Sequence, residues 1–348
     1  MEPQYYLNTY STYSLTDRIR QIIRDAKKYI KTGNFFFREP SMLEELKAAC
    51  QRGVVVFILS NLRDDENRLV AGNKFKKEEY DPHIPNLMDL VAMGAHVRCI
   101  SELHAKFLLS DGTSGMIMSS NYTIDSLFRN PECGVDLCNN DLIYLERLFD
   151  TIFTHADIRL AGRKKDGYRF LRYSSLIDPK VFQQNETDIL MTLAPHKNTE
   201  TNLANCNIIS LYNKIATIIN NAEGCVFLAA FSFRDIDKLP LVKNALLNAA
   251  NKNVEIFLIY NSEHYRNEKE ISPLQTRFPN IKPWGIPKNH AKFLFTEKEG
   301  MIFTSNIDGE IGLLTGFELG VRLSKLQHDQ CINSIQKLQQ EINDKKYE

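Results

Sequence analysis

The chain has 348 residues, of which 43% are hydrophobic and 25% charged, and its 43 basic side chains balance 43 acidic ones. This length is sufficient for two domains with full cores, and the composition is average for a soluble globular protein. Because the net charge is zero, any affinity for nucleic acid or an anionic membrane must come from a local patch of charge.

The sequence disfavours membrane-spanning, secreted and zinc-binding proteins. No stretch approaches the roughly 18 to 20 apolar residues of a membrane span. The N-terminal segment MEPQYYLNTYSTYSL lacks the basic start and the apolar run of a secretory signal. The cysteines are odd in number and never spaced as C-x-x-C: Cys50, Cys99, Cys133, Cys138, Cys206, Cys225 and Cys331. We therefore expect free thiols in a cytoplasmic protein and no zinc site.

The first half of the chain alternates helices with strands, and the second half repeats them. A helix, a strand, a second helix and a strand buried on both faces are predicted at residues 15–30, 35–38, 40–50 and 54–59. The same elements return at residues 211–222, 231–234, 240–250 and 254–259. Residue 19 corresponds to residue 215, so the offset is 196. Each half is therefore predicted to be one copy of an α/β unit.

Each half continues with an insertion, a third strand and a hairpin. The insertions, residues 62–87 and 262–280, are charged and irregular, and their length fits either a lid over the substrate or a solvated connection. The third strand is expected at 95–100 and 281–286, and the hairpin at 104–121 and 290–306. A further strand is expected after each hairpin, at 132–137 and 317–322. An amphipathic helix then closes each half.

The two hairpins share a sequence that can hold a phosphate. The first reads HAKFLLSDGTSGMIMSSN and the second HAKFLFTEKEGMIFTSN. Residues two apart in a strand share a face, so His104 lies beside Lys106 and His290 beside Lys292. The ammonium and the Ser and Asn side chains of the returning strand can bind phosphate oxygens. The imidazole can act as a nucleophile or a proton carrier near neutral pH.

Residues 157–205 break the repeat and are expected to be a linker or insertion. Within them, RKKDGYRFLRY at 163–173 interleaves basic side chains, which hold phosphates, with aromatic rings, which stack on unpaired bases. Short basic-aromatic runs are common, however, and are more often an exposed linker with an ordinary cluster of charges. The candidate nucleic-acid contacts are Arg163, Lys164, Lys165, Tyr168, Arg169 and Arg172.

The repeated motif resembles the signature H-x-K-x4-D-x6-G-S-x-N of the phospholipase D superfamily of phosphodiesterases. The first copy has Met118 in place of Gly and otherwise fits at His104, Lys106, Asp111, Ser119 and Asn121. In the second copy Glu297 stands at the Asp position and Thr304 at the Gly position, and the turn is one residue shorter. We therefore align Ser305 with Ser119.

The resemblance implies an α/β fold of two pseudo-twofold-related domains, each a mixed sheet covered by helices. We expect an N-terminal repeat at 1–156, a linker at 157–205 and a C-terminal repeat at 206–348. The two motifs would face each other and complete one active site within a single chain. An oligomer is then not required to build the site.

An in-line displacement needs one group that attacks phosphorus and another that protonates the leaving oxygen from the opposite side. The resemblance implies attack by one His, a phosphohistidine, and hydrolysis helped by the other His. In the superfamily the N-terminal His usually attacks, so we expect His104 to attack and His290 to serve as acid and base, although the symmetry of the copies does not choose between them.

The remaining motif residues have expected roles around the phosphate. Lys106, Lys292, Asn121 and Asn306 would bind its oxygens, Glu132 and Glu318 would orient the imidazoles, and Ser119 and Ser305 would be supporting donors. Asp111 and Glu297 lie in the turns and are read as structural. Because two lysines and neutral donors can stabilise the charge, neither a metal nor a cofactor is required. A His-based metal site would lack the clustered ligands it needs.

The superfamily cleaves phospholipids, nucleic acids and protein–nucleotide linkages with the same groups, so the motif does not name the substrate. The small size and the basic-aromatic run favour a nuclease acting on DNA or RNA. A phospholipid phosphodiesterase or phosphatidyltransferase is the alternative, for which an amphipathic membrane-surface helix would be expected. A non-catalytic nucleic-acid-binding protein is the second alternative.

Overall fold

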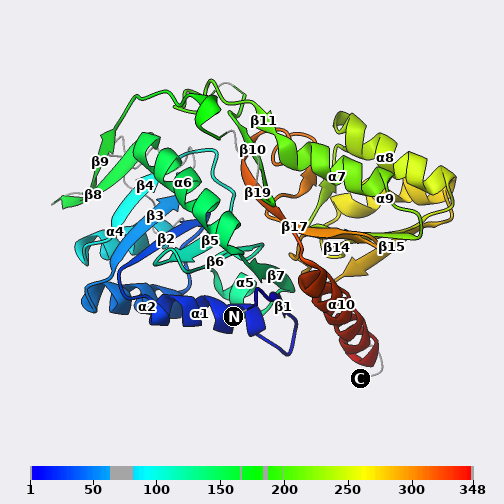
Figure 1. Cartoon of the computed structure of the whole chain (residues 1–348), viewed down its shortest axis with the longest axis horizontal. Coiled ribbons are helices and arrows are strands. Elements are labelled where there is room, and N and C mark those ends of the chain that lie inside the picture. The colour runs from blue at the N-terminus through cyan, green and yellow to red at the C-terminus, as the bar shows by residue number, and fades with distance from the viewer. Residues whose placement is uncertain (1, 63–80, 165–166, 183–186, 198, 346–348) are drawn as a thin grey trace.

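The computed structural model describes residues 2–62, 81–164, 167–182, 187–197 and 199–345. Two α/β halves lie next to each other, and each is built on one large sheet (Figure 1). Most of the first predicted insertion and Lys165 lie outside the described residues. Within the described residues, no helix is both long and apolar enough to cross a membrane.

The first sheet is mixed and has nine strands. In spatial order they are β1 (Tyr5–Asn8), β7 (Glu132–Asp136), β6 (Ser114–Met118), β5 (Phe107–Ser110), β2 (Tyr29–Asn34), β3 (Val55–Ser60), β4 (His96–Cys99), β8 (Ile158–Lys164) and β9 (Gly167–Arg172). Strands β2, β3 and β4 run parallel, and all other neighbours are antiparallel.

The second sheet repeats this order. Its strands are β11 (Ile208–Ile209), β10 (Ile189–Ala194), β19 (Gly316–Arg322), β17 (Gly300–Phe303), β16 (Phe293–Thr296), β12 (Cys225–Ala229), β14 (Glu255–Asn261) and β15 (Ile281–Ile286). The run from β10 to β15 corresponds strand by strand to the run from β1 to β4, with the same three parallel strands at its end. A short parallel pair, β13 (Phe233–Arg234) and β18 (Ile307–Asp308), stands apart. The predicted fold class, two α/β units with mixed sheets, is confirmed.

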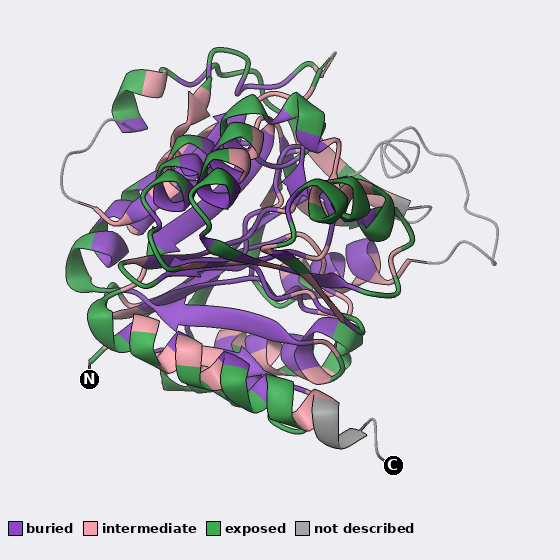
Figure 2. Cartoon of the chain, turned by 90° about the vertical axis from the view of Figure 1, so that its right-hand side faces the viewer, coloured by how far each residue is buried: buried purple, intermediate pink, exposed green. Residues whose placement is uncertain are grey.

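Helices cover both sheets because the central strands are buried on both faces. The helices of the first half are α1 (Ser14–Asp25), α2 (Pro40–Gln51), α4 (His83–Ala92), α5 (Ile124–Phe128) and α6 (Asn139–His155). Those of the second half are α7 (Ser210–Asn220), α8 (Pro240–Asn251), α9 (Arg266–Arg277) and α10 (Lys325–Lys345), and short 3-10 turns occupy Pro179–Phe182 and Ile236–Lys238. The buried residues gather on the strands and on the inner faces of the helices (Figure 2).

One core joins the two halves. It contains Phe107 and Phe149 of the first half together with Phe293, Phe317 and Leu338 of the second, all at most 2% exposed. Two further cores lie on the outer sides, one under α1, α2 and α4 and the other under α7 and α8. The facing sides of the sheets are therefore packed as the interior of one molecule.

Helix α10 follows the second repeat in the chain but packs on the first. The side chain of Gln330 accepts the Tyr5 N–H at 2.9 Å, and the Glu341 carboxylate accepts the Thr9 hydroxyl at 2.9 Å. Figure 1 shows α10 beside β1. Helix α6, which ends the first repeat, contacts β10 of the second sheet in turn. Each half is thus completed by contacts from the other.

The segment 157–205, expected as a linker or insertion, supplies strands to both sheets. Strands β8 and β9 extend the first sheet beyond β4, and β10 pairs antiparallel with β19 over six residues of each strand. Strand β10 takes the place that β1 has in the first half, so the second sheet begins before residue 206. The offset of 196 fails here because fifteen residues, 195–209, separate β10 from α7, whereas five, 9–13, separate β1 from α1.

Candidate active site

The two hairpins bring the candidate catalytic residues to the entrance of their first strands. His104 and Lys106 precede β5, and His290 and Lys292 precede β16. Both lysines are fully buried. Each ammonium donates to the backbone carbonyl of the histidine two residues earlier, Lys292 Nζ at 2.9 Å from His290 O. The imidazole and the ammonium of each motif are therefore neighbours.

Backbone hydrogen bonds hold each histidine against the opposite half. The N–H groups of His104 and Ala105 donate to Phe317 O on β19 at 3.0 and 2.7 Å. The N–H of His290 donates to Pro131 O, just before β7, at 3.0 Å. The two motifs therefore lie at the contact between the halves.

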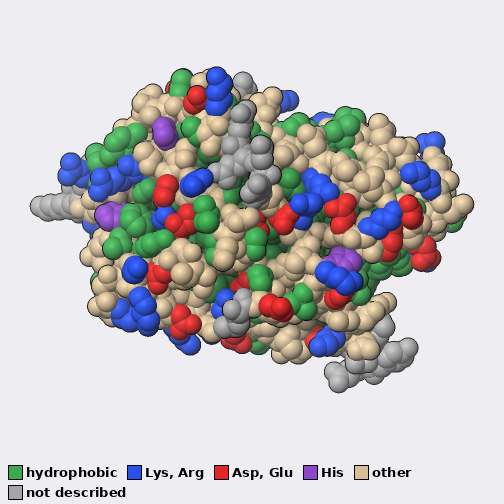
Figure 3. Space-filling view, viewed as in Figure 1, with side chains coloured by type: hydrophobic (Ala, Val, Ile, Leu, Met, Phe, Trp, Pro, Cys, Tyr) green, Lys and Arg blue, Asp and Glu red, His purple; other side chains and the backbone are tan. Residues whose placement is uncertain are grey.

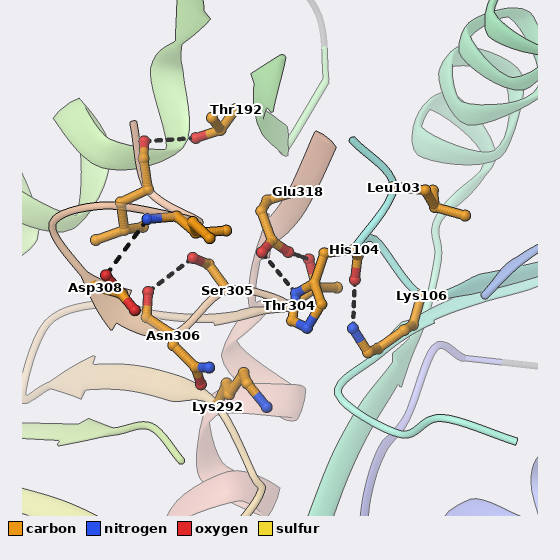
Figure 4. A network of polar contacts seen from close by, with 12 residues as sticks. Leu103, His104, Lys106, Thr192, Lys292, Thr304, Ser305, Asn306, Asp308 and Glu318 are labelled. Atoms are coloured by element: carbon orange, nitrogen blue, oxygen red, sulfur yellow. Dashed lines mark hydrogen bonds and ion pairs between the residues drawn. The ribbon is translucent and has the colours of Figure 1, made fainter. Parts of the chain in front are cut away.

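The orienting carboxylates are exchanged between the halves. His104 Nδ1 lies 2.7 Å from Oε1 of Glu318, which belongs to β19 of the second half (Figure 4). His290 Nδ1 lies 2.8 Å from Oε1 of Glu132, on β7 of the first half. Both carboxylates are buried. Each half thus supplies the carboxylate that faces the imidazole of the other.

A hydroxyl group fixes the second oxygen of each carboxylate. Ser119 Oγ donates to Glu132 Oε2, and Thr304 Oγ1 donates to Glu318 Oε2 (Figure 4). Hydrogen bonds of this kind stop a carboxylate from rotating and so fix the imidazole that it faces. Both hydroxyls are positioning groups in the structure.

The expected role of Ser305 is wrong, because Thr304 occupies the place that corresponds to Ser119. Ser305 Oγ turns away and donates to the backbone carbonyl of Asn306 at 2.7 Å. Spacing explains the error: Ser119 precedes Asn121 by two residues, as Thr304 precedes Asn306. The alignment of Ser305 with Ser119 ignored this spacing. Thr304, which also carries a hydroxyl group, is the counterpart of Ser119.

Burial and charge set the protonation of the cluster. Burial lowers the pKa of His104 to about 4 and that of Lys106 to about 7, and it also lowers the pKa values of His290 and Lys292. Burial opposes ionisation of Glu318 as well, but His104, Lys106 and the Thr304 hydroxyl outweigh it and keep that pKa below its ordinary value. At neutral pH the imidazole of His104 is therefore neutral. Its Nδ1–H donates to the carboxylate, which leaves the Nε2 lone pair free for attack.

A family model and the sheet order together decide the family. Residues 19–153 match the model described as cardiolipin synthase, PLD-like domain, and this range contains the whole first hairpin. The second half of the chain repeats the same order of strands. The first half of the chain belongs to the phospholipase D superfamily. A comparison with curated proteins found no match.

Solved structures share the fold of this chain at low identity. Phosphatidylserine synthase from Haemophilus influenzae Rd KW20 matches with a TM-score of 0.65 and 11% identity, over 98% of this chain and 86% of that one. Polyphosphate kinase from Porphyromonas gingivalis matches with a TM-score of 0.57 and 14% identity over 97% of this chain, which spans 50% of that protein. The phospholipase D family member Nuc from Salmonella typhimurium aligns at 19% identity and a TM-score of 0.38, over 49% of this chain and 100% of that one.

A cavity of about 690 Å³ opens on the His104 side of this phospholipase D-like site. Its lining includes His104, Asn306 and Glu318. His196 and Lys197, from the segment between β10 and α7, complete the wall. The first repeat has no segment of that length, so the cavity is asymmetric about the two motifs. The sequence repeat did not point to these two residues because they lie outside it.

The asparagine of each motif has one side-chain atom that makes no hydrogen bond within the described residues. The Oδ1 atoms of Asn121 and Asn306 are buried and have no hydrogen-bond partner among the described residues. A buried amide without a partner is costly, so such groups are usually held for a ligand or for water. Their binding of phosphate remains a prediction. In the described part of the chain, no group of three or more His, Cys, Asp and Glu is arranged to hold a metal ion.

Two phenylalanines that the sequence analysis did not select pack against the imidazoles. The ring centroids of Phe35 and His104 lie 5.3 Å apart, and those of Phe231 and His290 also lie 5.3 Å apart. Both aromatic residues follow the strand next to the hairpin, and the offset of 196 relates them. Their recurrence at equivalent positions was a usable signal. Each ring therefore restricts the movement of the imidazole that it contacts.

The basic-aromatic run forms the β8–β9 hairpin at the outer edge of the first sheet. Strands β2, β3 and β4 separate it from β5, and none of its described residues lines the cavity. Arg163 pairs with Asp89 of α4. The side chain of Lys164 is outside the described residues, as is Lys165. Contact with nucleic acid stays a prediction for Arg163, Tyr168, Arg169 and Arg172.

The acidic turn residues tie each hairpin to the preceding strand. The carboxylate of Asp111 accepts the backbone N–H groups of residues 27, 28 and 29 at 2.7, 2.9 and 2.8 Å. Glu297 accepts those of residues 223 and 225 at 2.9 and 3.1 Å. This is the structural role expected for both. The second turn is one residue shorter, and the longer side chain of Glu297 compensates for the difference in reach.

Replacing Asp111 with Ala is expected to lower the free energy of unfolding by about 1 to 3 kcal/mol, because three N–H groups lose a charged acceptor. Ala also disfavours the positive φ of 56° at this position. Urea denaturation followed by circular dichroism measures the change. Asp111→Asn keeps one acceptor oxygen and tolerates this φ, so it should lose less. Loss of phosphodiesterase turnover without loss of stability would instead make Asp111 part of the chemistry.

Proposed function

We propose that the chain is a metal-independent phosphodiesterase that hydrolyses DNA or RNA through a phosphohistidine intermediate. The exchanged His–Glu pairs carry this proposal: 2.7 Å for His104 and Glu318, and 2.8 Å for His290 and Glu132. Two imidazoles, each facing a buried carboxylate, can supply the nucleophile and the proton that an in-line displacement needs. The two buried ammonium groups beside them can neutralise a diester.

The reaction runs in two displacements. Nε2 of His104 attacks phosphorus, the N–P bond forms, and the P–O bond to the leaving group breaks as the leaving oxygen takes a proton from His290. Water then attacks phosphorus and gives a proton to His290, and the N–P bond breaks to release His104. We assign the attack to His104 because it lines the cavity and its side chain is 26% exposed, against 17% for His290.

Substrate binding is expected to raise the pKa of His290, so that this imidazole carries the proton that the first step needs. Burial lowers the pKa values of His290, Lys106 and Lys292 in the empty site. A diester anion placed among these groups raises their pKa values again, because an opposite charge in a low-dielectric site favours the protonated form. His290 therefore becomes a competent acid when the phosphate is bound, and the lysines become fully charged against it.

Polar side chains of the cavity can contact a nucleic acid. They include His196, Lys197, Thr199, Arg234 and Asp308. Such groups can bind the phosphates and hydroxyl groups that a nucleic acid brings. Acidic and basic side chains are interspersed over the face in Figure 3. Binding is therefore expected to depend on local contacts near the site.

Incubation in EDTA with labelled single-stranded DNA, double-stranded DNA, RNA and phosphatidylcholine vesicles tests the proposal. The wild-type protein is expected to cleave at least one nucleic acid, and His104→Ala is expected to cleave none. Turnover of the lipid alone would overturn the substrate class. Cleavage that disappears in EDTA and returns with a divalent cation would overturn the metal-independent mechanism.

A further inference from the structure

A series of aromatic rings leads from the candidate acid to the protein surface. His290 contacts Phe231, and Phe231 contacts His264 with ring centroids 5.2 Å apart. His264 stacks on Tyr265 at 5.7 Å, with their planes within 15°. The Tyr265 side chain is 77% exposed, so the series ends in solvent. One ring face of Tyr265 is covered by His264, and a planar group can continue the stack on the other.

The backbone under this series is held rigidly. Asn267, fully buried at the start of α9, accepts the N–H of Phe233 at 2.8 Å and donates to Phe231 O at 3.0 Å and Asn261 O at 2.9 Å. The His264 N–H also donates to Asn261 O, at 3.2 Å. The turn that carries Tyr265 is therefore fixed to the segment between β12 and β13 that carries Phe231. An aromatic ring on a fixed turn loses little conformational entropy when a ligand binds.

Arg266 fixes the orientation of the outermost ring. Its Nε–H donates to Tyr265 Oη at 2.8 Å, and its guanidinium lies 5.4 Å from the ring centroid. Three ring contacts, Tyr265 with His264, His264 with Phe231 and Phe231 with His290, connect this exposed ring to the candidate active site.

We propose that Tyr265 and Arg266 form a platform on which a base of a single-stranded nucleic acid stacks, next to the phosphate held between the two motifs. This inference rests on the proposed function, because it names a substrate contact of the same site. Aromatic side chains bind unpaired bases by stacking on their faces, and an adjacent Arg can contact the neighbouring phosphate. The platform would favour unpaired strands over duplexes, whose bases are already stacked.

An exposed aromatic residue can also anchor a protein at a lipid headgroup layer, but the surroundings disfavour that occupant here. Membrane anchors combine aromatic residues with apolar and basic neighbours. The exposed neighbours of Tyr265 in the sequence include Glu263 and Glu268 as well as Arg266 and Lys269, and none of them is apolar. Carboxylates next to the ring would oppose insertion into a membrane, whereas stacking of a base needs only the open ring face.

Cleavage of two matched oligonucleotides by full-length protein tests the platform. One is a single-stranded DNA with ordinary bases, and the other has the same length and phosphates but abasic residues around the cleavage site. Tyr265→Ala is expected to lower kcat/KM for the first by about 5- to 150-fold, the range typical for loss of one base–aromatic stack. It should leave kcat/KM for the abasic strand unchanged. Tyr265→Trp should keep activity on both.

The outcomes separate this inference from the proposed function. Tyr13, 37% exposed and on another part of the surface, gives the matched control Tyr13→Ala, which should change neither rate. If wild type cleaves both strands but Tyr265→Ala cleaves them as wild type does, the platform is wrong and the nuclease stands. If wild type cleaves neither strand, the proposed function fails and the platform with it. If Tyr265→Ala loses only binding to phosphatidylserine vesicles, the occupant is a membrane.

Discussion

Glu318→Gln is expected to lower the rate at which the phosphoenzyme forms by about 100- to 10,000-fold, the cost of losing the carboxylate that holds a catalytic imidazole in its tautomer. The carboxylate of Glu318 lies 2.7 Å from His104 Nδ1 and accepts a hydrogen bond from its N–H. A Gln amide can turn its NH2 group toward Nδ1, which would move the imidazole proton to Nε2 and remove the attacking lone pair. Rapid-quench measurement with bis(4-nitrophenyl) phosphate gives the rate.

Glu132→Gln is the matched control, because the carboxylate it removes faces the other imidazole. Nitrophenolate leaves without protonation, so loss of the Glu132–His290 contact should slow hydrolysis of the phosphoenzyme far more than its formation. Circular dichroism should show both variants folded, since Thr304 and Ser119 can still bond the amide. If the two variants slow the same step, or if Glu132→Gln alone blocks formation of the phosphoenzyme, Glu318 and Glu132 do not serve imidazoles with the two roles assigned here.

The repeat could be read from the sequence because both halves keep the same local pattern. The helical stripe, the buried strands and the two His-x-Lys hairpins each depend on neighbouring residues, and a fixed offset aligns them. The sheet order confirms two copies of one α/β unit. Two copies of an α/β unit were therefore accessible from periodicity, whereas the mixed sheets were expected from the resemblance to the superfamily.

The pairing of each Glu with the opposite His was not accessible in the same way. Glu132 and Glu318 hold equivalent positions, and either pairing respects the symmetry of the sequence. Which one forms depends on how the halves dock, and that is set by a core whose residues, such as Phe107 and Phe317, are scattered along the chain. The segment 195–209 was missed for a related reason, because it interrupts the offset just where it reaches the cavity.

The proposed active site needs both halves of the chain, because each half supplies the carboxylate that faces the imidazole of the other. A first half alone would keep His104 and Lys106 but lose Glu318, and its Glu132 would keep Ser119 but lose His290. The backbone carbonyl of Phe317, which holds the N–H groups of His104 and Ala105, would be lost as well. Packing of α10 on β1 further joins the halves. One chain with two motifs thus carries one site.

His290→Ala is expected to lower steady-state turnover of bis(4-nitrophenyl) phosphate by about 1,000-fold or more, while the protein still releases one nitrophenolate per molecule in a rapid burst. The first displacement does not need an acid for this leaving group, but the second has lost the base that activates water. The phosphoenzyme should accumulate, and mass spectrometry of its peptides should locate the group on His104.

His104→Ala should give neither burst nor phosphopeptide, because the attacking nitrogen is gone. The choice of His104 rests on its greater exposure and its place in the cavity wall, while His290 lies deeper, with Lys292 Nζ 3.2 Å from its Nδ1. An ammonium so close to His290 disfavours a positively charged imidazole until the substrate anion arrives, which suits a group that must both give and take a proton. A burst from His104→Ala, with phosphate on His290, would reverse the two roles.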